Sequence, residues 1–81
     1  MTYHVLIVDD QKDVSRLIRS ALETIEQGLR VSEAPSGEEA ILEASRNEVD
    51  LLIADYRLPG ITGVELMKKI RLRNPEVKVI M

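Results

Sequence analysis

Three aspartates follow two apolar segments of the chain. Residues 5–8 are Val-Leu-Ile-Val, and Asp9 and Asp10 come directly after them. Residues 51–54 are Leu-Leu-Ile-Ala, and Asp55 comes directly after them. Short apolar runs that stop abruptly are typical of strands buried on both faces of a parallel sheet. Since ligands of such sheets bind at the carboxyl ends of the strands, the three aspartates are the first candidates for a functional site.

If the two strands are neighbours in the sheet, these three carboxylates meet at one edge. Without a cation they would repel one another. Carboxylate and carbonyl oxygens together with water are the ligands of Mg²⁺ rather than of Zn²⁺. A carboxylate beside Mg²⁺ can attack phosphorus, because the ion offsets the negative charge of the phosphoryl oxygens. The residues therefore predict a magnesium site and are consistent with acyl phosphate formation there.

The segments around these aspartates alternate between strand and helix patterns. Apolar residues recur at helical spacing from Lys12 to about Gln27, and Gly28 is expected to end this helix in a left-handed conformation. Ser36 and Thr62 each begin a capping-box sequence. The expected order is a strand at residues 5–8, a helix at 12–27, a strand at 30–34, a helix from 36 to about 47, a strand at 51–54, a helix at 62–74 and a strand at 77–81.

This alternation predicts an α/β fold with a doubly wound parallel sheet, right-handed crossovers and helices on both faces. The expected strand order is the flavodoxin-like 2-1-3-4, which makes the first and third strands neighbours. A chain of 81 residues is too short for two hydrophobic cores. We therefore expect one domain.

Composition excludes several classes of function. The chain has 11 Lys and Arg against 14 Asp and Glu, so DNA binding by this segment is not expected. It has no Cys, which excludes disulfides, thiolate metal sites and cysteine nucleophiles. No apolar run is long enough for a signal peptide or a membrane span, and we expect a cytoplasmic protein. The one histidine, His4, has no carboxylate at a meaningful spacing and is expected at the surface.

The acidic strand ends and the turn after Asp55 are similar to a known family. The residues that carry the similarity are Val5-Leu6-Ile7-Val8-Asp9-Asp10, Leu51-Leu52-Ile53-Ala54-Asp55, Leu58-Pro59-Gly60 and Gly63. At this spacing, and over the whole chain, the sequence resembles the receiver domain of bacterial two-component response regulators.

The resemblance implies a role for each residue of the site. The family's aspartate at the end of the third strand accepts a phosphoryl group from a histidine kinase in a Mg²⁺-dependent reaction, which implies Asp55 here. The family's acidic pair binds Mg²⁺, which implies direct ligation by Asp10 and ligation through water by Asp9. The third protein ligand is the backbone carbonyl two residues after the acceptor, which implies Arg57.

The implied function is phosphorelay signal transduction by a phosphoprotein. Such a domain is not an enzyme, apart from its own phosphorylation and dephosphorylation. The implied partners are a sensor histidine kinase and an output domain or downstream effector outside this chain.

The family's domain is longer than this chain, so residues 1–81 are identified with its N-terminal part. The family's hydroxyl residue after the fourth strand and its lysine after the fifth have no counterpart here. A second interpretation therefore stays open: a degenerate or truncated receiver that acts only as an assembly module without phosphorylation. A phosphatase of the haloacid dehalogenase type is disfavoured because Gln11 stands where its second acid is needed, and a dinucleotide site is disfavoured because the turn after the first strand is acidic rather than glycine-rich.

The shorter chain also predicts uncovered apolar surface. The first helix is expected to lie alone on its face of the sheet, and the strand at 77–81 is expected to present an unpaired edge. Because such edges pair with other chains, we expect the 81-residue form to self-associate.

Overall fold

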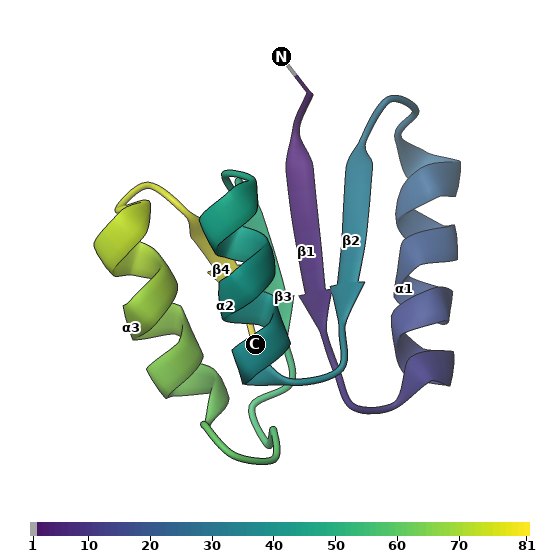
Figure 1. The fold of residues 1–81 in the computed structure, drawn as a ribbon. Coiled ribbons are helices and arrows are strands. Elements are labelled where there is room, and N and C mark those ends of the chain that lie inside the picture. The colour runs from purple at the N-terminus through teal and green to yellow at the C-terminus, as the bar shows by residue number, and fades with distance from the viewer. Residues whose placement is uncertain (1) are drawn as a thin grey trace.

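The computed structural model describes residues 2–81, which form one parallel sheet and the helices that connect its strands (Figure 1). The elements in chain order are β1 (His4–Val8), α1 (Lys12–Ile25), β2 (Arg30–Ala34), α2 (Gly37–Arg46), β3 (Leu51–Ala54), α3 (Gly63–Arg73) and β4 (Lys78–Ile80). The strand order is β2-β1-β3-β4, and every neighbouring pair is parallel. The predicted α/β fold class and strand order are therefore confirmed.

The register of the central strands decides which residues meet at the carboxyl edge. Val8, the last residue of β1, lies opposite Ala54, the last residue of β3. The next backbone amide continues this ladder, because Asp55 N–H donates to the carbonyl oxygen of Val8 at 2.9 Å. Asp9 N–H donates to the carbonyl oxygen of Ala34, the last residue of β2, at 3.1 Å. The sheet thus ends at the same level in all three strands, with an acidic residue after two of them.

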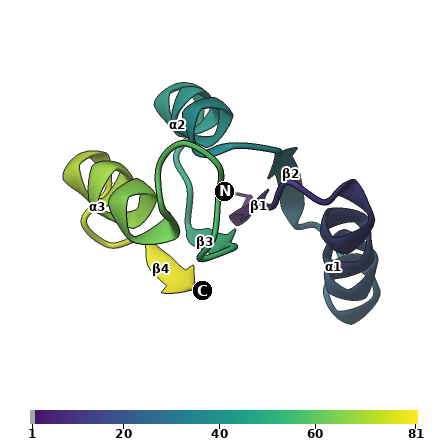
Figure 2. The same cartoon turned by 90° about the horizontal axis from the view of Figure 1, so that it is seen from below.

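The main core lies between the sheet and the helix pair α2 and α3. Figure 2 shows these two helices on one face of the sheet and α1 on the other. The buried residues of this core come from both layers and include Leu6, Val8, Ala34, Ala40, Val49, Leu52, Ala54, Leu58, Leu66, Ile70 and Val77. Full burial of one such aliphatic side chain contributes about 1.5 to 3 kcal/mol. The face under α2 and α3 therefore provides most of the hydrophobic stabilisation.

Two helix starts are set by capping residues. The Thr62 hydroxyl accepts from Glu65 N–H at 3.1 Å, and the Glu65 carboxylate accepts from Thr62 N–H at 3.3 Å, so this capping box is confirmed. Ser36 accepts from Glu39 N–H at 3.2 Å at the start of α2. The reciprocal bond from Ser36 N–H to Glu39, which the sequence predicts, is absent from the hydrogen bonds of residues 2–81. Ser36 is therefore a simple N-cap and does not form a capping box.

The first helix is shorter than expected. The sequence predicts that it extends to about Gln27, whereas its last helical residue is Ile25 and its C-cap is Glu26. Gly28 has the predicted positive φ, at 86°, but in the turn before β2 rather than at the helix terminus.

The apolar stripe of α1 is only partly covered. Val14, Ile18 and Leu22 are half-buried, whereas Leu17 and Ile25 are 72% and 78% exposed. Figure 2 shows the reason, because α1 lies beside β2 and no helix of the described chain covers β3 and β4 on that face.

The strands β3 and β4, which have one uncovered face, are also less buried than the sequence predicts. The sequence predicts full burial for residues 51–54, but only Leu52 and Ala54 are buried, and the alternate residues of β3 are half-buried. The last strand spans Lys78–Ile80 instead of residues 77–81, and Ile80 is exposed. A strand is buried on both faces only where both faces are packed, and here one face lacks its cover.

His4 lies in the interior, which corrects the expectation of a surface position. Its side chain is 3% exposed, with Nδ1 2.9 Å from the carbonyl oxygen of Glu48 and Nε2 2.8 Å from the hydroxyl oxygen of Ser32. The Ser32 hydroxyl lies 3.3 Å from the Glu43 carboxylate. These two partners of the ring are 44 and 28 residues away along the chain, so spacing in the sequence cannot reveal them.

The His4→Ala variant tests this buried network. We expect the free energy of unfolding to fall by about 2 to 4 kcal/mol, because the change leaves a cavity and removes the partner of buried polar groups. Urea denaturation followed by circular dichroism measures the change, with Ser20→Ala at an exposed position of α1 as the control. A surface histidine would give the same stability as this control.

Residues 1–81 in isolation are expected to self-associate through β4 or the uncovered face. Leu17, Ile25 and Ile80 expose apolar surface there, and β4 offers an unpaired edge. Light scattering over a concentration series measures the mass, and Ile25→Lys should lower it. A monodisperse monomer at high concentration would contradict the expectation.

Candidate metal centre

The structure brings the three aspartates of the sequence motif together. Each of Asp9, Asp10 and Asp55 offers one carboxylate oxygen, and these oxygens all lie within 4.8 Å of one another. Asp9 and Asp55 are half-buried, and Asp10 is exposed. The cluster lies at the carboxyl ends of β1 and β3, where the crossovers to α1 and α3 leave toward opposite faces of the sheet (Figures 1 and 2). This is the position where open parallel sheets bind ligands.

Two of the carboxylates are oriented by the backbone that follows them. Asp9 Oδ1 accepts from Gln11 N–H at 2.8 Å, and Asp55 Oδ1 accepts from Arg57 N–H at 3.0 Å. Each bond closes a short turn in which an aspartate side chain accepts from the amide two residues on. The same arrangement thus occurs after both strands. It fixes one oxygen of each carboxylate and leaves the other oxygen free of hydrogen bonds to residues 2–81.

No side chain of residues 2–81 forms a salt bridge with an aspartate of the cluster. Within the described residues, Arg19 forms a salt bridge with Glu33, and Nε2 of His4 lies 3.7 Å from a carboxylate oxygen of Glu43; neither pair includes an aspartate of the cluster. Three carboxylates at this separation repel one another, and a hard divalent cation with oxygen ligands would remove the repulsion. The donor set therefore fits Mg²⁺, with two oriented carboxylates, one exposed carboxylate and access to water.

The fourth residue of the predicted site, Arg57, lies on the exposed loop between β3 and α3. Its backbone N–H donates to the Asp55 carboxylate, as described above, and the sequence does not reveal this contact. The role of its carbonyl oxygen as a metal ligand stays a prediction.

Gly63 holds the start of α3 close to the backbone that follows β3. Its N–H donates to the carbonyl oxygen of Tyr56 at 3.3 Å. A Cβ atom on Gly63 would lie 2.8 Å from the carbonyl oxygen of Asp55 and 3.1 Å from the Cα atom of Tyr56. Only glycine allows this approach. The sequence names Gly63 through the family resemblance, but the contact itself depends on the tertiary structure.

The turn before α3 has the conformation that its sequence predicts. Gly60 has a φ of 85°, which agrees with the positive φ expected after Pro59. The residue before α3 is the Thr62 N-cap, so a turn and a cap fix the last part of the loop.

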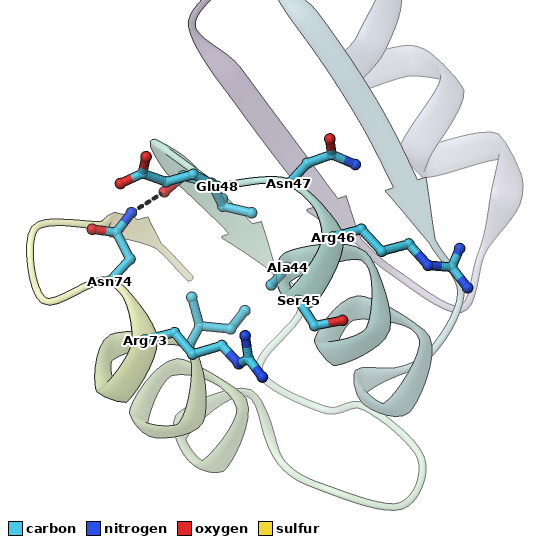
Figure 3. A pocket seen from close by; sticks show the side chains of 9 residues that line it. Ala44, Ser45, Arg46, Asn47, Glu48, Arg73 and Asn74 are labelled. Carbon is cyan, nitrogen blue, oxygen red and sulfur yellow. Dashed lines mark hydrogen bonds between the residues drawn. The ribbon is translucent and has the colours of Figure 1, made fainter.

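Two hollows lie near opposite edges of the sheet. One, of about 260 Å³, adjoins the aspartates and is lined by Ile7, Val8, Asp9, Ile18, Ile53, Ala54 and Asp55. The other, of about 220 Å³, lies between the C-terminal ends of α2 and α3 (Figure 3). Its wall includes Arg46 and Arg73, and Asn74 donates a hydrogen bond to the backbone carbonyl of Val49. No residue of the predicted site lines this second hollow, so the predicted chemistry belongs to the aspartate edge.

The described helices are all too short or too polar to cross a membrane.

Comparisons with known proteins agree with this architecture. The family model described as the response regulator receiver domain matches residues 5–81. The response regulator UvrY of Escherichia coli (strain K12) is 41% identical over 78 residues, which cover 96% of this chain and 36% of that protein. The KDP operon transcriptional regulatory protein KdpE of the same strain is 40% identical over 68 residues, which cover 84% of this chain and 29% of that protein. The chain therefore spans about a third of the length of these relatives.

A solved structure gives the same result for the fold. The response regulator TrrA from Thermotoga maritima, crystallised in complex with Mg²⁺-BeF, superposes with a TM-score of 0.87 at 31% identity. The match covers 99% of this chain and 68% of that one. Receiver domains are signalling domains of two-component systems. With the fold, the strand order and the family model in agreement, this chain belongs to the family of response regulator receiver domains.

Proposed function

We propose that the chain accepts a phosphoryl group on Asp55 in a Mg²⁺-dependent reaction and acts in phosphorelay signalling. The observation that carries this proposal is the cluster of Asp9, Asp10 and Asp55, whose ligand oxygens lie within 4.8 Å of one another. TrrA, which has the same fold, was crystallised in complex with Mg²⁺-BeF, and this supports Mg²⁺ binding by the present chain.

Each residue of the site has a proposed role. Asp10 ligates Mg²⁺ directly, Asp9 through water, and Asp55 and the backbone carbonyl of Arg57 complete the protein ligands. When bound, the ion would offset the negative charge that builds up on the phosphoryl oxygens. Asp55 is the nucleophile: one carboxylate oxygen forms the new bond to phosphorus while the bond from phosphorus to the donor breaks.

The hydrogen bond from Arg57 supports this role for Asp55. It holds Oδ1 at 3.0 Å, so the carboxylate keeps one orientation before a donor arrives. Pre-orientation of a nucleophile lowers the entropic part of the barrier. The half-buried position of Asp55, at the end of a strand rather than on a flexible side loop, has the same effect.

The proposed partners follow from the family. A sensor histidine kinase is the phosphoryl donor, and an output domain or downstream effector outside this chain responds. The names of UvrY and KdpE describe a response regulator and a transcriptional regulatory protein, which supports an output in gene regulation. We place the domain in the cytoplasm, and we propose that residues 1–81 correspond to the N-terminal part of a receiver domain.

Phosphorylation is tested by intact-mass spectrometry after incubation with acetyl phosphate, with and without Mg²⁺. We expect a single phosphoryl adduct that requires Mg²⁺ and is lost in Asp55→Asn, because an amide oxygen is a poor nucleophile and carries no charge. Asp13→Asn, an exposed carboxylate on the first turn of α1, should keep the adduct. Absence of the adduct from the folded wild-type chain would favour the degenerate receiver, which acts only in assembly.

Mg²⁺ binding is tested separately by thermal denaturation. At about ten times its Kd, an ion that binds only the folded state adds ~1.4 kcal/mol, which raises Tm by on the order of 5 to 10 °C in a domain of this size. Asp10→Asn should remove this Mg²⁺-dependent rise and should raise Tm in the absence of the ion, because it relieves repulsion in the cluster. An unchanged response to Mg²⁺ in this variant would argue against Asp10 as a ligand.

A further inference from the structure

The loop that follows Asp55 packs tightly against the first turn of α2. A Cβ atom on Gly37, the first residue of α2, would lie 2.6 Å from Cδ1 of Ile61 and closer still to its Cγ1. Real Cβ atoms do not approach side chains so closely, so the Ile61 side chain occupies the space that only glycine leaves open. Gly37 is buried and Ile61 is half-buried, and the contact joins two segments that lie 24 positions apart in the sequence.

A second contact lies beside the first. A Cβ atom on Gly60 would lie 2.7 Å from a carboxylate oxygen of Glu38, the residue after Gly37. The loop therefore follows the start of α2 over two successive residues on each side. Glycine occurs on the helix side of one contact and on the loop side of the other, which allows the two backbones to approach closely.

The rest of the loop is fixed at both ends. At its start, Asp55 N–H belongs to the β1–β3 ladder, and at its end Thr62 caps α3. Residues 56–61 connect these two fixed points, and within them Arg57 holds the carboxylate of Asp55. Two side chains of this segment pack against the core: Leu58 is buried in it, and Ile61 packs against both the core and α2. A shift of Ile61 must therefore be taken up by the residues between it and Asp55, which include Leu58.

From this geometry we infer that Gly37 and Ile61 are positioning residues for the acceptor site. The Ile61 side chain fills the space beside Gly37 that the missing Cβ atom leaves open, which we call the notch. This contact sets where the loop places Arg57 relative to Asp55. This inference rests on the proposed function for its consequence in Mg²⁺ binding and phosphorylation. Its structural part, the position of Arg57, does not depend on that function.

A double-mutant cycle tests the inference. In Gly37→Ala, the new methyl group overlaps Cγ1 and Cδ1 of Ile61, so this side chain must move, and the inference expects the loop to move with it. In the double variant Gly37→Ala with Ile61→Ala, the clashing atoms are gone, and the distance from the new Cβ to the Cβ of residue 61 would be 3.8 Å, an ordinary contact. In the Ile61→Ala background, Gly37→Ala should therefore change neither the position of Arg57 nor the affinity for Mg²⁺.

Two readouts separate positioning from simple loss of stability. The first is the amide of Arg57 in the metal-free protein, observed by ¹⁵N NMR, whose hydrogen exchange should accelerate in Gly37→Ala as its bond to Asp55 weakens. The second is the Kd for Mg²⁺, which should rise by roughly tenfold or more, as for other partners that orient metal ligands. Both should return to the values of Ile61→Ala alone in the double variant.

Gly28→Ala provides a matched control for destabilisation. Gly28 has a φ of 86°, which strains alanine, but a Cβ there would meet nothing within 4 Å. This variant should lower Tm and leave both the Arg57 amide and the Mg²⁺ affinity unchanged. If Gly37→Ala alone does not fold, the comparison of Ile61→Ala with the double variant still tests the fit, because alanine at position 37 should then cost nothing.

The inference is overturned if Gly37→Ala lowers Tm but leaves the Arg57 amide and the Kd as in the wild type. It is also overturned if Gly37→Ala changes the Arg57 amide and the Kd for Mg²⁺ by the same amount in the presence of Ile61 and in the Ile61→Ala background. Failure of the proposed function looks different, because the wild-type chain itself would then bind no Mg²⁺ and form no adduct. The Arg57 amide in the metal-free variants would still decide whether the notch positions the loop.

Discussion

The parallel pairing of β1 with β3 is the constraint on which the acidic site depends. It places Val8 opposite Ala54, so that the residues after them begin the two crossovers from adjacent points. Like charges on flexible segments would move apart, whereas here the backbone ladder and the core beneath it hold them in place. The free energy that forms the central sheet therefore also maintains an electrostatic repulsion, which is typical of sites whose ligand supplies the opposite charge.

The fold class, the strand order and the elements could be predicted because their signals are local or follow from connectivity. Apolar runs, helical periods and caps such as Thr62 depend on a few neighbouring residues, and right-handed crossovers leave few topologies. The meeting of Asp9 and Asp55 could be predicted for the same reason. It requires only that two adjacent strands end in acid, and no side-chain packing has to be known.

The features that the sequence did not reveal all involve partners far apart along the chain. His4 is buried because Ser32 and Glu48 satisfy its ring, and no periodicity connects these residues. The apolar run at residues 51–54 by itself predicts full burial, whereas Leu51 and Ile53 are half-buried because α1 lies alone on their face of the sheet (Figure 2), as the length of the chain predicts. The contact between Gly37 and Ile61 is of the same kind as those of His4, since a glycine at the start of a helix usually has a local explanation.

The backbone bonds of Asp9 and Asp55 have a consequence for dynamics. Their amides belong to the central ladders, whereas Tyr56 and Arg57 lie exposed on the loop that follows. Amides of central strands open only with large parts of the sheet, while exposed loops open locally at much lower free energy. Motion of the loop on its own would thus change the surroundings of two aspartates whose backbone stays in place. The strand ends that carry Asp9 and Asp55 open slowly, whereas the exposed loop after Asp55 opens more often. These two parts of the site can therefore respond to a ligand on different timescales.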